Sequence, residues 1–268
     1  HRALTLSLPV RMFRAMNLDI SELLSGWDYK PGQVVARRFP GQDGKEKVQL
    51  RVDLGILQMN AEGRPDGRRP MAHDSWHDFQ LERLRKHVES HGDDEGFILD
   101  AEACSKLQQE CIQYHHRYIC FFQLEDFPAV ELDCERNLRV FEFVAEYAES
   151  DELAWSLLQF VPQLLMMRAR ARGTALIRRK RFEKACTGIE EGLEELEAFY
   201  RENGREDLMA NSGEITSLKS WLEEIRERRP LSEIEKLQRA LEEAIRVEDY
   251  ERAAQVRDQM HKLQASES

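Results

Sequence analysis

Histidine and cysteine side chains recur at helical spacing in the middle of the chain, so metal binding is the first chemistry to consider. One helix can present residues three or four apart on a single face. Two pairs have such spacing, His73 with His77 and His87 with His91, and Cys111, His115 and Cys120 fall near one another on one predicted helix. A structural zinc site needs four converging ligands, and a catalytic one usually brings an H-E-x-x-H signature. Neither pattern is present, so we expect exposed histidines and buried cysteines, with no metal and no cofactor.

Motifs for phosphate binding and for nucleophilic catalysis are missing from the sequence. There is no G-x-x-x-x-G-K-[ST] loop, and no G-x-G-x-x-G follows a predicted strand. No Ser, Cys or Thr lies in a recognisable nucleophile motif. Because the chain has eight histidines and many carboxylates, accidental pairs between them are expected and do not indicate a catalytic site. We therefore predict no catalytic residue and no enzymatic activity. An unrecognised site between bundle helices would reveal itself as a bound metal or a deep polar pocket around His115 and His116.

A basic segment is the main indication of nucleic-acid binding. Between residues 168 and 184 the only acid is Glu183. The cations of this segment are Arg168, Arg170, Arg172, Arg178, Arg179, Lys180, Arg181 and Lys184. Such a patch could neutralise several phosphates, with strongly salt-dependent binding. However, the first three arginines alternate and would spread over about 200 degrees of a helix, and no aromatic platform accompanies them. A solvated face, or a socket for the acidic residues of 190–197, is the favoured interpretation.

Composition narrows the class of protein. The 268 residues are 41% hydrophobic and 33% charged, as in a folded helical protein, and the net charge of −11 argues against a surface that binds nucleic acid or anionic lipid throughout. No apolar run approaches 18 residues, so no membrane span is expected. The five cysteines form no C-x-x-C pair, which favours free thiols and a cytoplasmic location.

The N-terminal quarter has the only strand-like pattern. Residues 1–16 begin without Met, and Pro9 breaks their short apolar run, so we interpret them as an extension. Residues 17–72 are predicted to form a small β-hairpin unit after a short helix. Alternating residues flank a turn cluster at 40–44, and the phase breaks after Gly55 as at a β-bulge.

Residues 73–229 have the 3.6-residue periodicity of helices throughout and predict a helical body. Ser75 or Asp78 begins the first helix, and Asp100 and Asp151 are expected to cap later ones. Pro162 should kink the helix over residues 155–171. The predicted fold class is mainly α: a helical bundle or stacked helical hairpins with a small N-terminal β-hairpin unit.

Residues 231–265 predict a final helical hairpin. Ser232 and Glu235 form a capping box, and Asp249 can cap a second helix after a connection of residues 246–248. The apolar stripe of the first helix consists of Ile234, Leu237, Leu241, Ala244 and Ile245, and the inward side of the second is expected to be Tyr250, Ala253, Ala254, Val256, Met260 and Leu263. So short a hairpin cannot bury its apolar stripe alone.

This hairpin resembles the UVR motif of the bacterial excision-repair proteins UvrB and UvrC. The resemblance covers about 30 residues and is carried by Leu241, Glu242, Ala244, the turn 248–251, Ala253, Ala254, Val256, Arg257, Asp258 and Leu263. In that family the hairpin is a docking device, and two hairpins pair through aromatic and small-residue faces. The resemblance implies protein binding through Leu241, Ala244, Tyr250, Ala253, Ala254, Arg257 and Asp258. The ATPase and nuclease motifs of the two repair proteins are missing here.

A second segment has similar residues at an offset of 68. Residues 178–185 align with residues 246–253, since both have a turn followed by an aromatic residue, Glu, a basic residue and Ala. We expect a second hairpin of the same build. The leading hypothesis is an intracellular bacterial adaptor whose partner is another protein, either one with a UVR-type hairpin or a copy of itself. The alternative is a nucleic-acid accessory factor that uses the basic segment.

Overall fold

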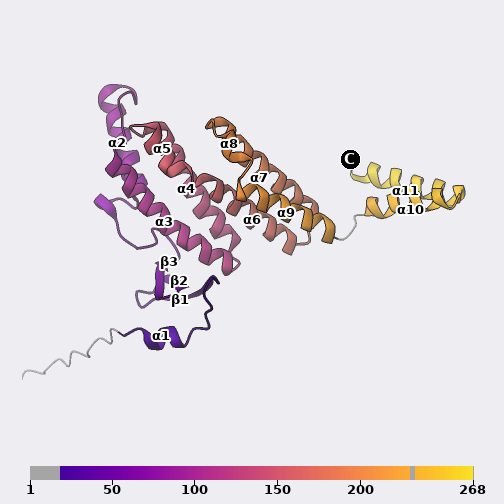
Figure 1. Ribbon diagram of the computed structural model, residues 1–268, viewed down its shortest axis with the longest axis horizontal. Coiled ribbons are helices and arrows are strands. Elements are labelled where there is room, and N and C mark those ends of the chain that lie inside the picture. The colour runs from indigo at the N-terminus through magenta and orange to yellow at the C-terminus, as the bar shows by residue number, and fades with distance from the viewer. Residues whose placement is uncertain (1–18, 230–232, 268) are drawn as a thin grey trace, which may run out of the picture. The chain divides into compact units, whose positions relative to one another are not determined.

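The computed structural model describes residues 19–229 and 233–267, and the chain divides into two compact units between Ala175 and Leu176 (Figure 1). The predicted fold class is confirmed, since the chain is mainly helical with a small N-terminal antiparallel sheet. The predicted extension, residues 1–16, lies outside the described residues. The division falls within the body predicted over 73–229, inside the helix over residues Val161–Arg178. No helix among residues 19–229 and 233–267 is long and apolar enough to cross a membrane.

The first unit begins with a short helix, α1 (Ser21–Ser25), and a three-stranded sheet in the order β1 (Val35–Pro40), β2 (Glu46–Val52) and β3 (Gly55–Asn60). The predicted bulge after Gly55 is wrong. Val52 pairs directly with Gly55, so two residues make a tight turn and a third strand follows. Leu54 lies at this turn and is almost fully exposed, so its apolar side chain does not mark a buried strand position.

The helices of the first unit follow the 3₁₀ turn Pro70–Ala72 and are α2 (Trp76–His91), α3 (Ala101–Gln123), α4 (Phe127–Tyr147), α5 (Asp151–Leu158) and α6 (Val161–Arg178), the last of which continues into the second unit. Side chains at Ser75, Asp100, Asp126 and Ser150 accept backbone N–H groups at the starts of α2 to α5, so Ser150 rather than Asp151 is the cap. The helix α3 packs along α4 and against β1 and β2 (Figure 1). Its buried residues include Leu107 and Tyr118.

The predicted kink at Pro162 is a break between two helices. The helix α5 ends at Leu158, and α6 begins at Val161. Pro162 is therefore the second residue of α6, where a backbone N–H would have no partner inside the helix, so its missing donor costs little.

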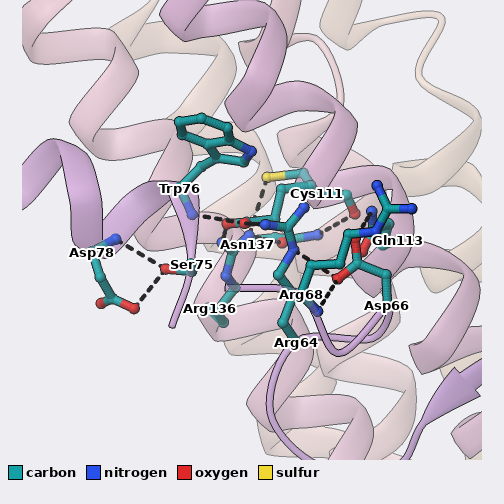
Figure 2. Close-up of polar contacts among 11 residues, drawn as sticks. Arg64, Asp66, Arg68, Ser75, Trp76, Asp78, Cys111, Gln113, Arg136 and Asn137 are labelled. Atoms are coloured by element: carbon teal, nitrogen blue, oxygen red, sulfur yellow. Dashed lines mark hydrogen bonds and ion pairs between the residues drawn. The ribbon is translucent and has the colours of Figure 1, made fainter. Parts of the chain in front are cut away.

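A buried cluster of charges connects α3 and α4 to the chain between β3 and α2. Arg117 on α3 forms a two-pronged ion pair with Asp133 on α4, at 2.8 and 2.6 Å, and donates to the carbonyl oxygens of Asn60 at 3.1 Å and Gly63 at 2.6 Å. Glu110, which is fully buried, accepts from Arg136. Figure 2 shows polar contacts in this region, including Arg136 and Asn137 of α4 and Arg64 of the loop before α2.

The second unit contains α7 (Phe182–Glu202), α8 (Glu206–Met209), α9 (Gly213–Arg228), α10 (Glu233–Arg246) and α11 (Tyr250–Glu267). The helices α7 and α9 pack together and bury Ile189, Leu196, Leu218 and Leu222. The helices α10 and α11 pack on each other as the predicted hairpin. Ser232 of the predicted capping box lies outside the described residues.

The same helix-ending turn recurs along the chain. In the α10–α11 turn, Asp249 N–H donates to Ala244 at 2.8 Å and Glu248 N–H to Ile245 at 3.0 Å, which is a Schellman motif. In the α6–α7 turn, Arg181 and Lys180 make the corresponding bonds to Leu176 and Ile177, at the offset of 68 found in the sequence. Glu125 and Asp126 repeat the pattern between α3 and α4. The predicted likeness of the two segments is confirmed at the level of the turn.

Candidate docking hairpin

The α10–α11 turn is held by main-chain and side-chain hydrogen bonds. Glu248 has a φ of 61°, in the left-handed region where a helix reverses into its connection. The Asp249 side chain accepts the backbone N–H of Arg252 at 3.0 Å and caps α11, as predicted from the sequence. The turn is therefore pre-organised, and a partner that binds it meets a backbone already in place.

The interior of the hairpin is made of small residues near the turn. Ala244 on α10 and Ala253 and Val256 on α11 are buried, whereas Leu241 and Met260 are half-buried. Small side chains allow two helices to approach closely, and the buried contact they provide is correspondingly small. Some of the larger apolar residues of the hairpin are left exposed to solvent.

Three of those residues surround the turn. Tyr250 is 70% exposed, Val247 55% and Ile245 54%. The sequence predicts that Tyr250 faces inward, and this is wrong: Tyr250 is exposed at the first residue of α11, after α10 has ended at Arg246. Ala254 is also exposed, because it is one residue, or about 100 degrees, away from the buried stripe of Ala253 and Val256.

The predicted docking residues thus fall into two groups. Ala244 and Ala253 hold the helices together and Leu241 is half-buried between the groups, while Tyr250, Ala254, Arg257 and Asp258 are exposed. Sequence reasoning missed Val247 and placed Ile245 inside. The sequence feature that indicates their exposure is their position at a polar turn, where an apolar side chain has little to pack against.

The basic segment does not form one surface within either unit. Arg168, Arg170 and Arg172 belong to the first unit, and the first two are half-buried. Arg172 pairs with Glu131 and, at 2.8 Å, with Glu135 of α4. The other four cations, Arg178, Arg179, Lys180 and Arg181, are exposed at the α6–α7 turn of the second unit.

Two of the acidic residues of 190–197 pair with cations outside the basic segment. Glu190 pairs with Arg226 and Glu197 with Lys219, at 3.0 Å for the second pair. Both partners are on α9, which packs along α7 and brings its own cations to the acidic face.

The histidines and cysteines converge on no metal site within the described part of the chain, where no three His, Cys, Asp or Glu side chains are grouped to hold an ion. All five cysteines are free and buried. His87 stacks on His91 with ring centroids 4.2 Å apart, and His77 packs edge-on against Phe143. His115 and His116 line a pocket of the first unit, but its lining is mainly apolar and is not the deep polar pocket expected of an unrecognised catalytic site.

Comparison with known proteins identifies the hairpin alone. The family model described as the UvrB/uvrC motif, UVR, matches residues 232–266, which includes both helices and the turn. No curated protein and no solved structure matches the chain. The chain therefore carries a UVR motif, a helical hairpin that mediates protein–protein interaction, and the family model matches no other part of it.

Proposed function

We propose that this protein is a non-catalytic adaptor that binds another protein through the turn end of its α10–α11 hairpin. The partner surface consists of Tyr250, Val247 and Ile245, with Ala254, Arg257 and Asp258 beside them on α11. The partner is a UVR-type hairpin of another protein or of a second copy of this chain.

The observation that carries the proposal is the exposure of three large apolar side chains around one rigid turn. Tyr250, Val247 and Ile245 lie within six residues of each other in sequence, and more than half of each side chain is accessible. Burial of such side chains against a partner gains roughly 25 cal/mol for each Å² of apolar surface. Tyrosine is well suited to be the anchor, because it combines a large apolar ring with a polar tip.

The polar residues around this surface fit the edge of a protein interface. Arg257 and Asp258 are exposed on α11, and Glu248 and Glu251 flank Tyr250. Interfaces commonly combine an apolar centre with a polar rim, which contributes orientation more than affinity.

The test compares Tyr250→Ala with the matched control Leu132→Ala. Leu132 is an apolar residue of similar exposure, 63%, on α4 of the first unit. Two differently tagged full-length copies are co-expressed and co-purified, and the wild type is used to capture partners from extract. We expect Tyr250→Ala to lose the self-associated or captured partner and Leu132→Ala to retain it. Equal capture by both variants would refute the proposal.

A second candidate function rests on the α6–α7 turn. Arg179, Lys180, Arg181 and Lys184 are exposed there, next to the turn geometry shared with the UVR hairpin. Replacement of the first three by Ser should abolish any binding to duplex DNA, and the wild-type affinity should fall steeply between about 50 and 200 mM salt. Absence of DNA binding by the wild type at 50 mM salt would exclude this function.

A further inference from the structure

A pocket of about 410 Å³ lies within the first unit, between α3, α4 and the start of α6. Residues of α3 at helical spacing, Gln108, Ile112 and His115, form one wall. The opposite walls come from Phe141 on α4 and from Phe160 and Leu164 around the break between α5 and α6. The volume falls in the range of small-molecule sites, roughly 300 to 1,000 Å³.

Apolar and aromatic side chains form much of the pocket wall. Phe141, Leu164 and Tyr118 are buried and form its inner part. Ile112 and Phe160 are 48% and 44% exposed, so they form an apolar rim that solvent can reach. An entering ligand would bury these side chains, which gives a driving force for binding of an apolar body.

Three polar side chains of the pocket have no hydrogen-bond partner among the described residues. Within the described part of the chain, no group hydrogen-bonds the side chains of Gln108, His116 or Gln163, which all line the cavity. Asn137 is different, because it donates to the Cys111 carbonyl and accepts from Arg136, both at 3.0 Å. The pocket therefore offers two free amides and an imidazole to a ligand.

A second imidazole is oriented by a neighbour. The Nδ1 atom of His115 lies 2.7 Å from the hydroxyl of Tyr118, which is almost fully buried. No other hydrogen bond of this hydroxyl occurs among the described residues, so donation to Nδ1 is the arrangement that satisfies the buried O–H group. The proton of the neutral ring is then on Nε2, and His115 has a defined donor.

The side chains that line the pocket favour an uncharged ligand. Burial lowers the pKa of His115 and of His116, which favours the neutral rings, and raises the pKa of the Cys111 thiol to about 12. No Asp, Glu, Lys or Arg is among the lining residues. A carboxylate, phosphate or ammonium would lose its hydration here without gaining a counterion.

We propose that this pocket binds an uncharged aromatic small molecule that carries a hydrogen-bonding group. The aromatic body would pack between Phe141, Phe160 and Ile112, and its polar group would bond Nε2 of His115 or the Gln108 and Gln163 amides. This site goes beyond the docking function, since it lies in the first unit and uses none of the hairpin residues.

The experiment measures binding of three probes of one shape to the full-length protein by calorimetry and by amide NMR shifts. The probes are 2-naphthol, which is neutral and polar at one position, naphthalene, which has no polar group, and 2-naphthoate, which is anionic. We expect 2-naphthol to bind about threefold to tenfold more tightly than naphthalene, as one hydrogen bond implies. The affinity of 2-naphthoate should be at least tenfold lower than that of 2-naphthol.

Two variants locate the site and its donor. Ile112→Trp should fill the pocket and abolish binding, whereas Leu132→Trp, at an exposed position outside the pocket, should leave it unchanged. His115→Phe keeps a ring but removes the donor, so it should remove the preference for 2-naphthol over naphthalene. Failure of the wild type to bind 2-naphthol at millimolar concentration, tighter binding of 2-naphthoate, or equal loss in Leu132→Trp would overturn the proposal.

Discussion

The backbone N–H of Trp76, at the start of α2, donates to the carboxylate of Glu110 on α3 at 2.8 Å. The same carboxylate accepts from Arg136 on α4, and Arg64 lies 3.5 Å away from it (Figure 2). A buried anion at a helix N-terminus satisfies a backbone donor and interacts favourably with the helix dipole. Glu110 therefore joins α2, α3, α4 and the preceding loop at one fully buried point.

Replacement of Glu110 by Gln should destabilise the first unit by about 3 kcal/mol. The variant keeps the shape of the side chain but removes the carboxylate that pairs with Arg136 and leaves Arg64 with Asp66 alone, and an unpaired buried charge is costly. The matched control is Glu102→Gln, which breaks an exposed pair with Lys106 on the same helix and should cost less than about 1 kcal/mol. Urea unfolding followed by circular dichroism measures both, and similar midpoints for the two variants would contradict the assigned role.

Replacement of Arg117 by Lys should release the loop that follows β3. An ammonium cannot make the two-pronged pair with Asp133 and also reach the carbonyl oxygens of Asn60 and Gly63. We expect faster amide hydrogen exchange over residues 60–68 and a loss of about 3 kcal/mol in the free energy of unfolding. Arg85→Lys, at an exposed position on α2, is the control, and no change in exchange is expected there.

Acidification should destabilise the protein through His77. Burial, together with the nearby Arg136 and Arg139, lowers the pKa of His77 to about 4, although Asp78 opposes the shift. The unfolded chain binds this proton near pH 6.5 and the folded chain near pH 4, so stability falls as the pH decreases through that interval. His77→Phe should flatten the dependence of the melting temperature between pH 7 and 5. The control is His91→Gln, at an exposed position, which should leave the pH dependence of the melting temperature as in the wild type. If His77→Phe also leaves that pH dependence unaltered, His77 is excluded as its cause.

The turn of the hairpin should become more stable with glycine at its left-handed position. Glu248 has a φ of 61°, which costs an ordinary residue about 1 kcal/mol relative to glycine. Glu248→Gly should therefore raise the thermal stability of the hairpin while leaving Tyr250 in place. Glu248→Val should lower it, because a β-branched side chain is poorly tolerated at positive φ. Helicity measured by NMR over residues 233–262 distinguishes the two, and equal effects would contradict the assigned conformation.

Local patterns were enough to predict the helices and the last hairpin. The spacing of apolar residues and the caps at Ser75, Asp100 and Asp249 depend on neighbours within a few residues, and the structure retains them. Predictions failed where contacts between residues distant in sequence, or small differences between two alternative local structures, decided which structure formed. The break before Pro162 and the third strand after Gly55 are two such places, because each periodic pattern fits both alternatives.

The amino-acid sequence by itself determined the mainly helical class, the UVR hairpin with its repeated turn, and the lack of catalytic motifs, because these follow from residues close together in the chain. Only the tertiary structure decided which side chains remain accessible. It placed Tyr250 beyond the end of α10, buried Glu110 beneath the start of α2, and brought His115 and Phe160 to one pocket. Such arrangements depend on how elements distant in sequence pack, and local periodicity carries no information about that packing.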